Sequence, residues 1–370
     1  MHILIDGNSL ENGKAGIGHY TYNLIHELAE VLGERDKLCV SIRQKLLDKN
    51  AELGINSVPV TITRERSFSR YMPFSPNWMR GFDLYHQPNY VPHVFDGKIV
   101  TTIHDMSHRI FPQYHPRRRV LLLRAFENRL RKADRIITDS QHARGEIVEL
   151  LRIPEDRVRV IYLGASSEYR PLAMSQEKRI ELQIKYNLPE QFLLYVGTIE
   201  PRKNLERLVE AYYVYKKEEP NSELKLVLAG GKGWLYEGIF TRVQELQLEQ
   251  DIVFTGYIDG EDLPFLYNMA IAFVYPSLYE GFGLPPLEAM SCGTPVISSN
   301  TSSIPEVVGE AGILIDPYQV NDLAAAIYKV AGSLSLQDEL SRKGLERAQL
   351  FSWKKCAEET LQVYRECMQE

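Results

Sequence analysis

Two glutamates that enclose a glycine-rich segment are the residues of this chain best suited to hold a polar ligand. Glu280 and Glu288 are separated by seven residues in the segment EGFGLPPLE, which follows an apolar run at residues 271–275. That run predicts a buried parallel strand, and a short helix is expected at residues 286–291 because proline is tolerated in the first helical turn. A strand, a glycine loop and a helix N-terminus form the usual anion-binding corner of an open α/β sheet. Glu288, expected in the first helical turn, taken alone fits an acid that offsets the helix dipole, but the pair around Gly-Phe-Gly favours a ligand site.

Two adjacent cations follow another predicted strand, at residues 192–196. Arg202 and Lys203 lie in the segment VGTIEPRKNL, just before a helix expected near Asn204. Positive charge at the start of a helix is unfavourable for the helix itself, so the pair indicates a nearby anion. Ordinary exposed surface charge is the alternative.

Two segments in the first half of the chain also follow predicted strands. The loop GKAGIGHY, residues 13–20, opens a helix expected at residues 18–32, and its glycines allow backbone N–H groups to approach an anion. A plain turn explains those glycines equally well. The segment TIHDM places His104 and Asp105 at the end of a strand at residues 99–103; a histidine that is satisfied within its loop is the default interpretation there.

Short apolar runs alternate with amphipathic helices twice along the chain, which predicts the α/β class: two Rossmann-like, doubly wound domains facing a central cleft. We place the domains at residues 1–170 and 171–352, with a last helix at residues 353–370. Residues 63–80 are interpreted as a long functional loop. The expected strands are residues 3–6, 38–42, 84–86, 99–103, 135–138 and 158–162, then 192–196, 224–229, 252–255, 271–275, 295–298 and 313–315.

The composition is that of a globular enzyme. The chain has 370 residues, of which 44% are hydrophobic and 25% charged, and a formal charge of −6 argues against a general nucleic-acid binder. No apolar run approaches the ~20 residues of a membrane-spanning helix, and the start MHILIDGNSL lacks the features of a signal peptide. The four scattered cysteines are interpreted as reduced thiols, which predicts a cytoplasmic protein.

Taken together, these segments resemble the retaining glycosyltransferases of family 4, which have the GT-B fold. The segments that carry the resemblance are EGFGLPPLE with the following AMSCGTPV, GIGHYTYNL, TIHDM, TDSQHA and VGTIEPRKNL, and it spans nearly the whole chain. It implies that the last helix packs back on the first domain. The segments look most like bacterial mannosyltransferases of surface polysaccharide (lipopolysaccharide) assembly. That implies transfer of a hexose, mannose from GDP-mannose, to a saccharide or lipid-linked saccharide.

The resemblance also implies roles for the candidate residues. Retention of configuration through a front-face process needs no protein nucleophile, so catalysis rests on positioning and on charge stabilisation. Arg202 and Lys203 would stabilise the leaving diphosphate; Lys203 matches the family pattern, whereas Thr198 stands where many members carry the arginine. His104 and Glu280 would hold hydroxyls of the transferred sugar.

The remaining implied contacts concern the nucleotide. Glu288 suits the ribose hydroxyls, because a carboxylate accepts two hydroxyl donors. No metal or other cofactor is expected, because the two cations can replace Mg²⁺ at the diphosphate and no Asp-x-Asp motif lies in a plausible site. The other donor-binding candidates are Gly16 and Gly18 at the diphosphate, Tyr257 and Ile258 at the base, and Gly281, Phe282, Gly283 and Leu284 at the sugar and phosphate.

Residues 109–135 are strongly basic, with leucines interleaved. An ordinary helix with a solvated basic face is the slightly preferred interpretation. Contact with an anionic membrane surface or a lipid-pyrophosphate acceptor is the alternative, and would place the protein at the inner face of the membrane.

Three rival functions remain. A nucleotide-sugar 2-epimerase shares the two-domain layout but does not explain the paired glutamates. A nicotinamide-dependent dehydrogenase needs a complete glycine fingerprint, which the sequence lacks. A catalytically retired saccharide-binding subunit is the non-enzyme alternative, and the intact set of His104, Lys203, Glu280 and Glu288 weighs against it.

Overall fold

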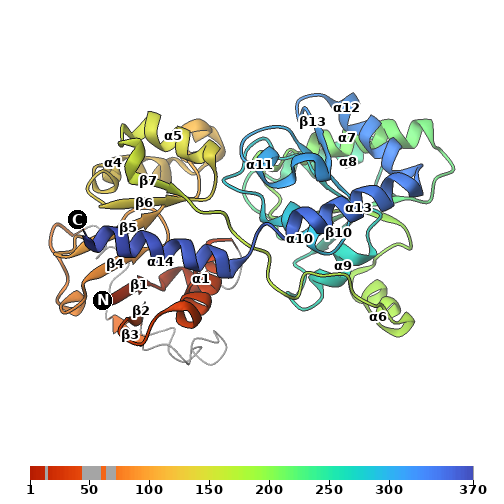
Figure 1. Cartoon of the computed structure of the whole chain (residues 1–370). Helices are drawn as coiled ribbons and strands as arrows, with labels where there is room; N and C mark the ends of the chain where they lie inside the picture. Colours follow the sequence, from red (N-terminus) through yellow and green to blue (C-terminus); the bar gives the residue numbers. More distant parts are fainter. Residues whose placement is uncertain (13–15, 44–59, 64–71, 370) are drawn as a thin grey trace. The chain divides into compact units, whose positions relative to one another are not determined.

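The computed structural model describes residues 1–12, 16–43, 60–63 and 72–369. The chain folds as two compact units, Met1–Gly164 with Ser352–Glu370, and Ala165–Phe351 (Figure 1). The unit boundaries therefore follow residues 164 and 351, where the sequence-based boundaries followed 170 and 352. Residues 64–71 of the predicted functional loop lie outside the described part of the chain.

The first unit is built on a parallel sheet. Its seven described strands lie in the order β3-β2-β1-β4-β5-β6-β7, so consecutive windings run outward in both directions from β1 and β4. Strand β3 is absent from the predicted set, because four residues at a sheet edge give little periodic signal. The strands are β1 (His2–Asp6), β2 (Lys37–Arg43), β3 (Val60–Thr63), β4 (Leu84–Gln87), β5 (Lys98–Thr102), β6 (Arg135–Thr138) and β7 (Val158–Val160).

The helices of this unit include the end of the chain. Helix α14 (Trp353–Gln369) packs beside α1 (Ile17–Val31), as the family resemblance implied (Figure 1). Tyr364 of α14 donates to or accepts from Nδ1 of His86 on β4 at 2.6 Å, and this bond is buried. The other helices are α3 (Ser107–Ile110), α4 (Arg117–Leu130) and α5 (Gln141–Leu151).

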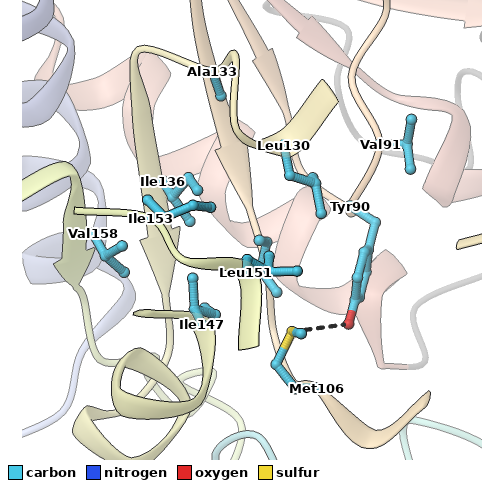
Figure 2. Close-up of a cluster of buried hydrophobic side chains, with 11 residues drawn as sticks. Tyr90, Val91, Met106, Leu130, Ala133, Ile136, Ile147, Leu151, Ile153 and Val158 are labelled. Atoms are coloured by element: carbon cyan, nitrogen blue, oxygen red, sulfur yellow. Dashed lines mark hydrogen bonds between the residues drawn. The ribbon is translucent and has the colours of Figure 1, made fainter. Parts of the chain in front are cut away.

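Apolar side chains of α4, α5 and the strands beside them form a hydrophobic core in the first unit (Figure 2). Leu130 of α4, Ile136 of β6 and Ile147 of α5 are all fully buried in this cluster. The Tyr90 hydroxyl reaches the Met106 sulfur at 3.7 Å at the edge of this cluster. The core thus fixes α4 and the segment after β5, where His104 lies, on the same sheet.

The second unit is also built on a parallel sheet, with six described strands in the order β10-β9-β8-β11-β12-β13. Its winding reverses between β8 and β11, and ligands of open α/β sheets bind at the carboxyl ends of such a pair. The strands are β8 (Phe192–Val196), β9 (Lys225–Ala229), β10 (Ile252–Gly256), β11 (Ala272–Tyr275), β12 (Val296–Ser299) and β13 (Ile313–Ile315). The helices are α6 (Gln176–Tyr186), α7 (Leu205–Glu218), α8 (Glu237–Glu245), α9 (Leu263–Met269), α10 (Leu284–Ser291), α11 (Ile304–Val308), α12 (Val320–Ala331) and α13 (Leu334–Ala348).

Among the described residues, no helix is both long enough and apolar enough to cross a membrane.

Candidate functional site

The carboxylate of Glu280 binds both predicted cations. Arg202 NH1 donates to Glu280 Oε2 at 2.9 Å, and Lys203 Nζ donates to Glu280 Oε1 at 2.6 Å. Two hydroxyls, of Tyr275 at 2.9 Å and Ser277 at 2.6 Å, also donate to Oε1. The loops after β8 and β11 are thereby joined at the point where the winding of the sheet reverses.

Arg202 is held by a second carboxylate. Its Nε and NH2 donate to Oε1 of Glu200, at 3.1 and 2.8 Å, and its NH1 donates to the Tyr279 carbonyl at 2.6 Å. Arg202 and Lys203 lie in a 3-10 turn, Pro201–Lys203, ahead of α7. The planar guanidinium is therefore fixed by geometry as well as by charge.

Burial and neighbouring charges shift the pKa of both the Glu280 carboxyl and the Lys203 ammonium. Burial opposes ionisation of Glu280, but the charges of Arg202 and Lys203 outweigh it and lower the pKa of the carboxyl to about 2. Burial lowers the pKa of the Lys203 ammonium despite the neighbouring Glu280 charge. Glu280 is accordingly ionised throughout the neutral range.

The loop between Glu280 and α10 is fixed by two serines that follow β12. Ser302 Oγ accepts from the Glu280 N–H at 2.9 Å, and Ser303 Oγ donates to the Phe282 carbonyl at 2.6 Å. Gly283 has a φ of 128°, a region that side chains rarely adopt, and a Cβ there would lie 2.9 Å from Ile304. Glycine is thus required at the entry to α10.

Helix α10 begins earlier than the sequence indicated. It starts at Leu284 rather than at residue 286, because Pro285 and Pro286 both fit within the first turn and do not have to open it. Glu288 consequently lies in the second turn, and the prediction of a first-turn position was wrong. Gly281, Phe282 and Gly283 precede the helix as predicted.

Glu288 is buried beside two tyrosines. The Tyr267 hydroxyl donates to Glu288 Oε2 at 2.9 Å, and Tyr169 hydrogen-bonds to the same carboxyl group. Burial raises the pKa of Glu288 to about 7, although the Tyr267 bond partly opposes the rise. The two glutamates of the motif therefore differ in charge near neutral pH, since Glu280 is ionised and Glu288 is half protonated.

The two residues predicted to meet a base follow β10. Tyr257 is 73% exposed, whereas Ile258 is buried at 7% exposure. An exposed aromatic ring next to a buried aliphatic residue offers a stacking face. The turn leads into α9, whose Tyr267 bonds to Glu288.

Gly16 and Gly18 of the first unit lie at the start of α1. Gly16 precedes the helix with a φ of 52°, and its carbonyl accepts from the Tyr20 N–H at 3.1 Å. Gly18 is buried inside the first turn. Residues 13–15 of the predicted loop lie outside the described residues.

His104 follows β5, and both of its ring nitrogens are engaged within the first unit. Nδ1 lies 2.7 Å from Oδ2 of Asp139, and Nε2 lies 2.9 Å from the Pro88 carbonyl oxygen. Burial lowers the pKa of His104, but the charge and hydrogen bond of Asp139 outweigh it and raise the pKa above its ordinary value. The ring of Tyr20 packs edge-on at 4.7 Å between ring centroids.

Several residues that build these arrangements were not predicted. Glu200 stands inside the quoted VGTIEPRKNL segment, and Asp139 stands inside TDSQHA, directly after β6. Their position just beyond a strand end was the available signal, because neighbouring parallel strands bring such residues to one edge. Ser302, which follows β12, carried the same signal, whereas Tyr267 lies within α9 and carried none.

The structure thus brings Arg202, Lys203 and Glu280 together, places Glu288 on the adjoining helix, and puts His104 in the other unit. Among the described residues, no group of three or more His, Cys, Asp or Glu could hold a metal ion.

The raised pKa of Glu288 predicts a pH-dependent stability difference. The unfolded carboxyl ionises near its ordinary value of 4.5 and the folded one near 7, so wild-type stability is lost as pH rises between these values. Glu288→Gln is always neutral and escapes this loss. Urea unfolding at pH 5 and pH 8 is expected to show the variant gaining about 2.5 kcal/mol on wild type between the two pH values. A difference that stays constant with pH would contradict the assignment.

The comparisons with known proteins agree with this geometry. Residues 15–169 match the family model described as Glycosyltransferase Family 4, and residues 176–347 match the model described as Glycosyl transferases group 1. The chain is 41% identical to "O-antigen chain mannosyltransferase B" of Escherichia coli over 99% of this chain and 100% of that protein. It is 34% identical to "Serotype-specific mannosyltransferase WbdA" of Escherichia coli over 64% of this chain and 29% of that longer protein.

Solved structures share the whole fold. HepE of Anabaena, determined in complex with UDP and glucose, has a TM-score of 0.77 at 17% identity, covering 99% of this chain and 100% of that chain. WaaG, a glycosyltransferase involved in lipopolysaccharide biosynthesis, has a TM-score of 0.72 at 14% identity, covering 98% and 99%. With two Rossmann-like units, paired glutamates and full-length similarity to a curated relative, the chain belongs to glycosyltransferase family 4 and has the GT-B fold.

Proposed function

We propose that this glycosyltransferase moves mannose from GDP-mannose to a saccharide or lipid-linked saccharide acceptor with retention of configuration. The observation that carries the proposal is the cluster of Arg202 and Lys203 on Glu280, in the loop that leads into the helix of the second glutamate of the motif. The choice of mannose is supported by the E. coli relatives, which are named mannosyltransferases. The same relatives suggest O-antigen or other surface polysaccharide as the product.

The cations fit the charge that develops in such a transfer. As the bond between the anomeric carbon and the phosphate oxygen breaks, its electron pair moves onto the leaving diphosphate. Arg202 and Lys203 are fixed before the reaction, and preorganised donors of this kind stabilise developing charge without reorganisation. They would serve in place of a metal ion, and we propose that no metal is required.

Retention is supported by the bonds of the two candidate bases. An inverting transfer needs a general base on the face opposite the leaving group. Glu280 is committed to the two cations, and Nε2 of His104 is directed at the Pro88 carbonyl rather than left open to accept a proton. In the front-face process the acceptor hydroxyl passes its proton to the leaving phosphate, so no protein base is needed.

The donor's other parts are assigned by the same proposal. The carboxyl of Glu288 would accept hydrogen bonds from the ribose hydroxyls. Its ionised form, which prevails above its pKa of about 7, would bind these hydroxyls better. Tyr257 and Ile258 would border the base, and Gly16 and Gly18 the diphosphate. His104 and Glu280 would contact hydroxyls of the transferred sugar.

Calorimetric titration with GDP, UDP, ADP and dTDP tests the donor site. We expect GDP to bind best, with unchanged affinity in EDTA, and Glu288→Ala to lose roughly 1–3 kcal/mol because a charged hydrogen-bond partner is removed. Glu249→Ala, an exposed glutamate, serves as the control.

A preference for UDP would overturn the mannose assignment but leave the fold and the proposed mechanism unaffected. Binding of none of the four would favour a retired saccharide-binding subunit. Isomerised sugar nucleotide formed without any acceptor would favour an epimerase.

We also propose that α4 contacts an anionic membrane surface at the inner face of the membrane. Leu121 and Leu122 are exposed at 69% and 41%, although the core-facing side of α4 is formed by other apolar residues. Arg117, Arg118 and Arg119 are exposed in the first turns of the same helix. Leucines beside a basic cluster combine apolar insertion with attraction to anionic lipids.

Vesicle co-sedimentation tests this contact. Triple charge reversal at Arg117, Arg118 and Arg119 to Glu is expected to weaken binding to phosphatidylglycerol vesicles by at least about 100-fold, because the loss of three attractions alone costs about 1 kcal/mol per residue. Reversal of Arg342 and Lys343, exposed on α13 of the other unit, should leave binding intact. Equal binding by the triple variant and wild type would remove the proposal.

A further inference from the structure

The His104–Asp139 pair has the composition of a catalytic dyad but not the hydrogen bonding of one. In a general-base dyad the carboxylate holds one ring nitrogen protonated and the other nitrogen is left as an acceptor. Here Nδ1 lies 2.7 Å from Asp139 Oδ2, and Nε2 lies 2.9 Å from the Pro88 carbonyl oxygen.

The Pro88 carbonyl decides the protonation of Nε2. A carbonyl oxygen only accepts hydrogen bonds, so Nε2 must carry a proton. A second proton must lie between Nδ1 and Oδ2, because two bare acceptors at 2.7 Å would repel each other. The pair therefore holds two protons, whichever atom the shared one is nearer, and loss of either breaks one of the two bonds.

We propose that Asp139 is a positioning residue that keeps His104 doubly protonated and immobile, so that the ring serves transfer as a fixed group and not as a proton acceptor. This inference rests on the proposed function for its catalytic consequence, and on the two ring contacts for its structure. Asp139 is suited to the task because its side chain is only 3% exposed and follows β6, the neighbour of the strand that leads to His104.

The groups that surround the pair act in the same direction or are neutral. Asp105, next in the chain, adds negative charge that favours the imidazolium. Tyr20 of α1 packs edge-on against the ring, and its hydroxyl bonds to Thr102 of β5 at 3.0 Å. His86 of β4 is kept neutral, because burial lowers its pKa to about 3.

Helix α14 contributes further neighbours of the His104–Asp139 pair. Tyr364 of α14 bonds to Nδ1 of His86, whose Nε2 bonds to Thr102 at 2.8 Å. Cys356, also on α14, lies close enough to Asp139 for the Asp139 charge to contribute to its raised pKa, which burial raises most. Burial raises the pKa of the Asp139 carboxyl, and the charge and hydrogen bond of His104 oppose that rise.

The test is a ¹⁵N NMR titration of the histidine ring in the full chain, which needs no substrate. In wild type, both nitrogens of His104 are expected to be protonated at pH 6, and the titration midpoint should lie above the ordinary 6.5. Asp139→Asn retains the shape and can donate to Nδ1, which allows a neutral ring, so its midpoint should fall below 6.5. Asp105→Asn, which removes a nearby charge but no ring contact, should shift the midpoint far less.

The activity arm separates positioning from mere structure. Transfer by Asp139→Asn is expected to fall by up to about 100-fold at pH 7, a size typical of a misplaced catalytic group, and the alkaline limb of its pH profile should move to lower pH. A wild-type ring with one unprotonated nitrogen at pH 6, or an Asp139→Asn titration and pH profile equal to wild type, would overturn the inference. If Asp139→Asn does not fold, the wild-type titration alone decides between these outcomes. If wild type shows the expected titration but transfers no sugar, the result would count against the proposed function instead.

Discussion

The second unit depends on one buried carboxylate that binds two cations from another loop. Without Glu280, Arg202 and Lys203 would be two neighbouring positive charges with little solvent around them, since their side chains are 16% and 9% exposed. Breaking a buried ion pair by removing one partner is strongly destabilising. The pairing therefore fixes the 3-10 turn after β8 and the glycine loop after β11 in one arrangement. The glycine loop leads directly into α10 and so sets the position of its N-terminus.

In the proposed function, the charges of this cluster bear on how a diphosphate would be bound. Two cations face two carboxylates, Glu200 and Glu280, so the cluster is formally neutral before any ligand arrives. An incoming diphosphate therefore shares cations that are already compensated. The N-terminus of α10 adds a partial positive charge, and protonation of Glu288 near neutral pH removes a negative one.

The sequence was most informative where apolar runs are continuous. The strands at residues 135–138, 192–196 and 313–315 agree with the structure to the residue. The strand at residues 192–196 is the clearest case, because a strand buried on both faces is an uninterrupted hydrophobic segment. The start of α10 was misplaced because two prolines were expected to open the helix, whereas Leu284 precedes them in it. Hydrophobic periodicity does not locate the first residue of a helix to that precision.

Partnerships between distant residues were the main part that the sequence could not supply. Glu280 stands 77 residues from Lys203 in the chain, and only the order of β8 and β11 in the sheet brings their loops together. The residue types at the site were predicted, but the role of Glu280 as the partner of the cations was not. For His104 the same holds, since its bonds to Asp139 and Pro88 depend on β4, β5 and β6 being neighbours.

The central claim is that Arg202 and Lys203 are placed to bind the leaving diphosphate. The most direct measurement is the affinity of GMP and of GDP for wild type and for Lys203→Ala, because only GDP carries the second phosphate. Our account predicts that the variant loses at least about tenfold in GDP affinity, the equivalent of one charge-assisted hydrogen bond, and binds GMP as wild type does. Equal losses for the two nucleotides, or no loss for GDP, would contradict it.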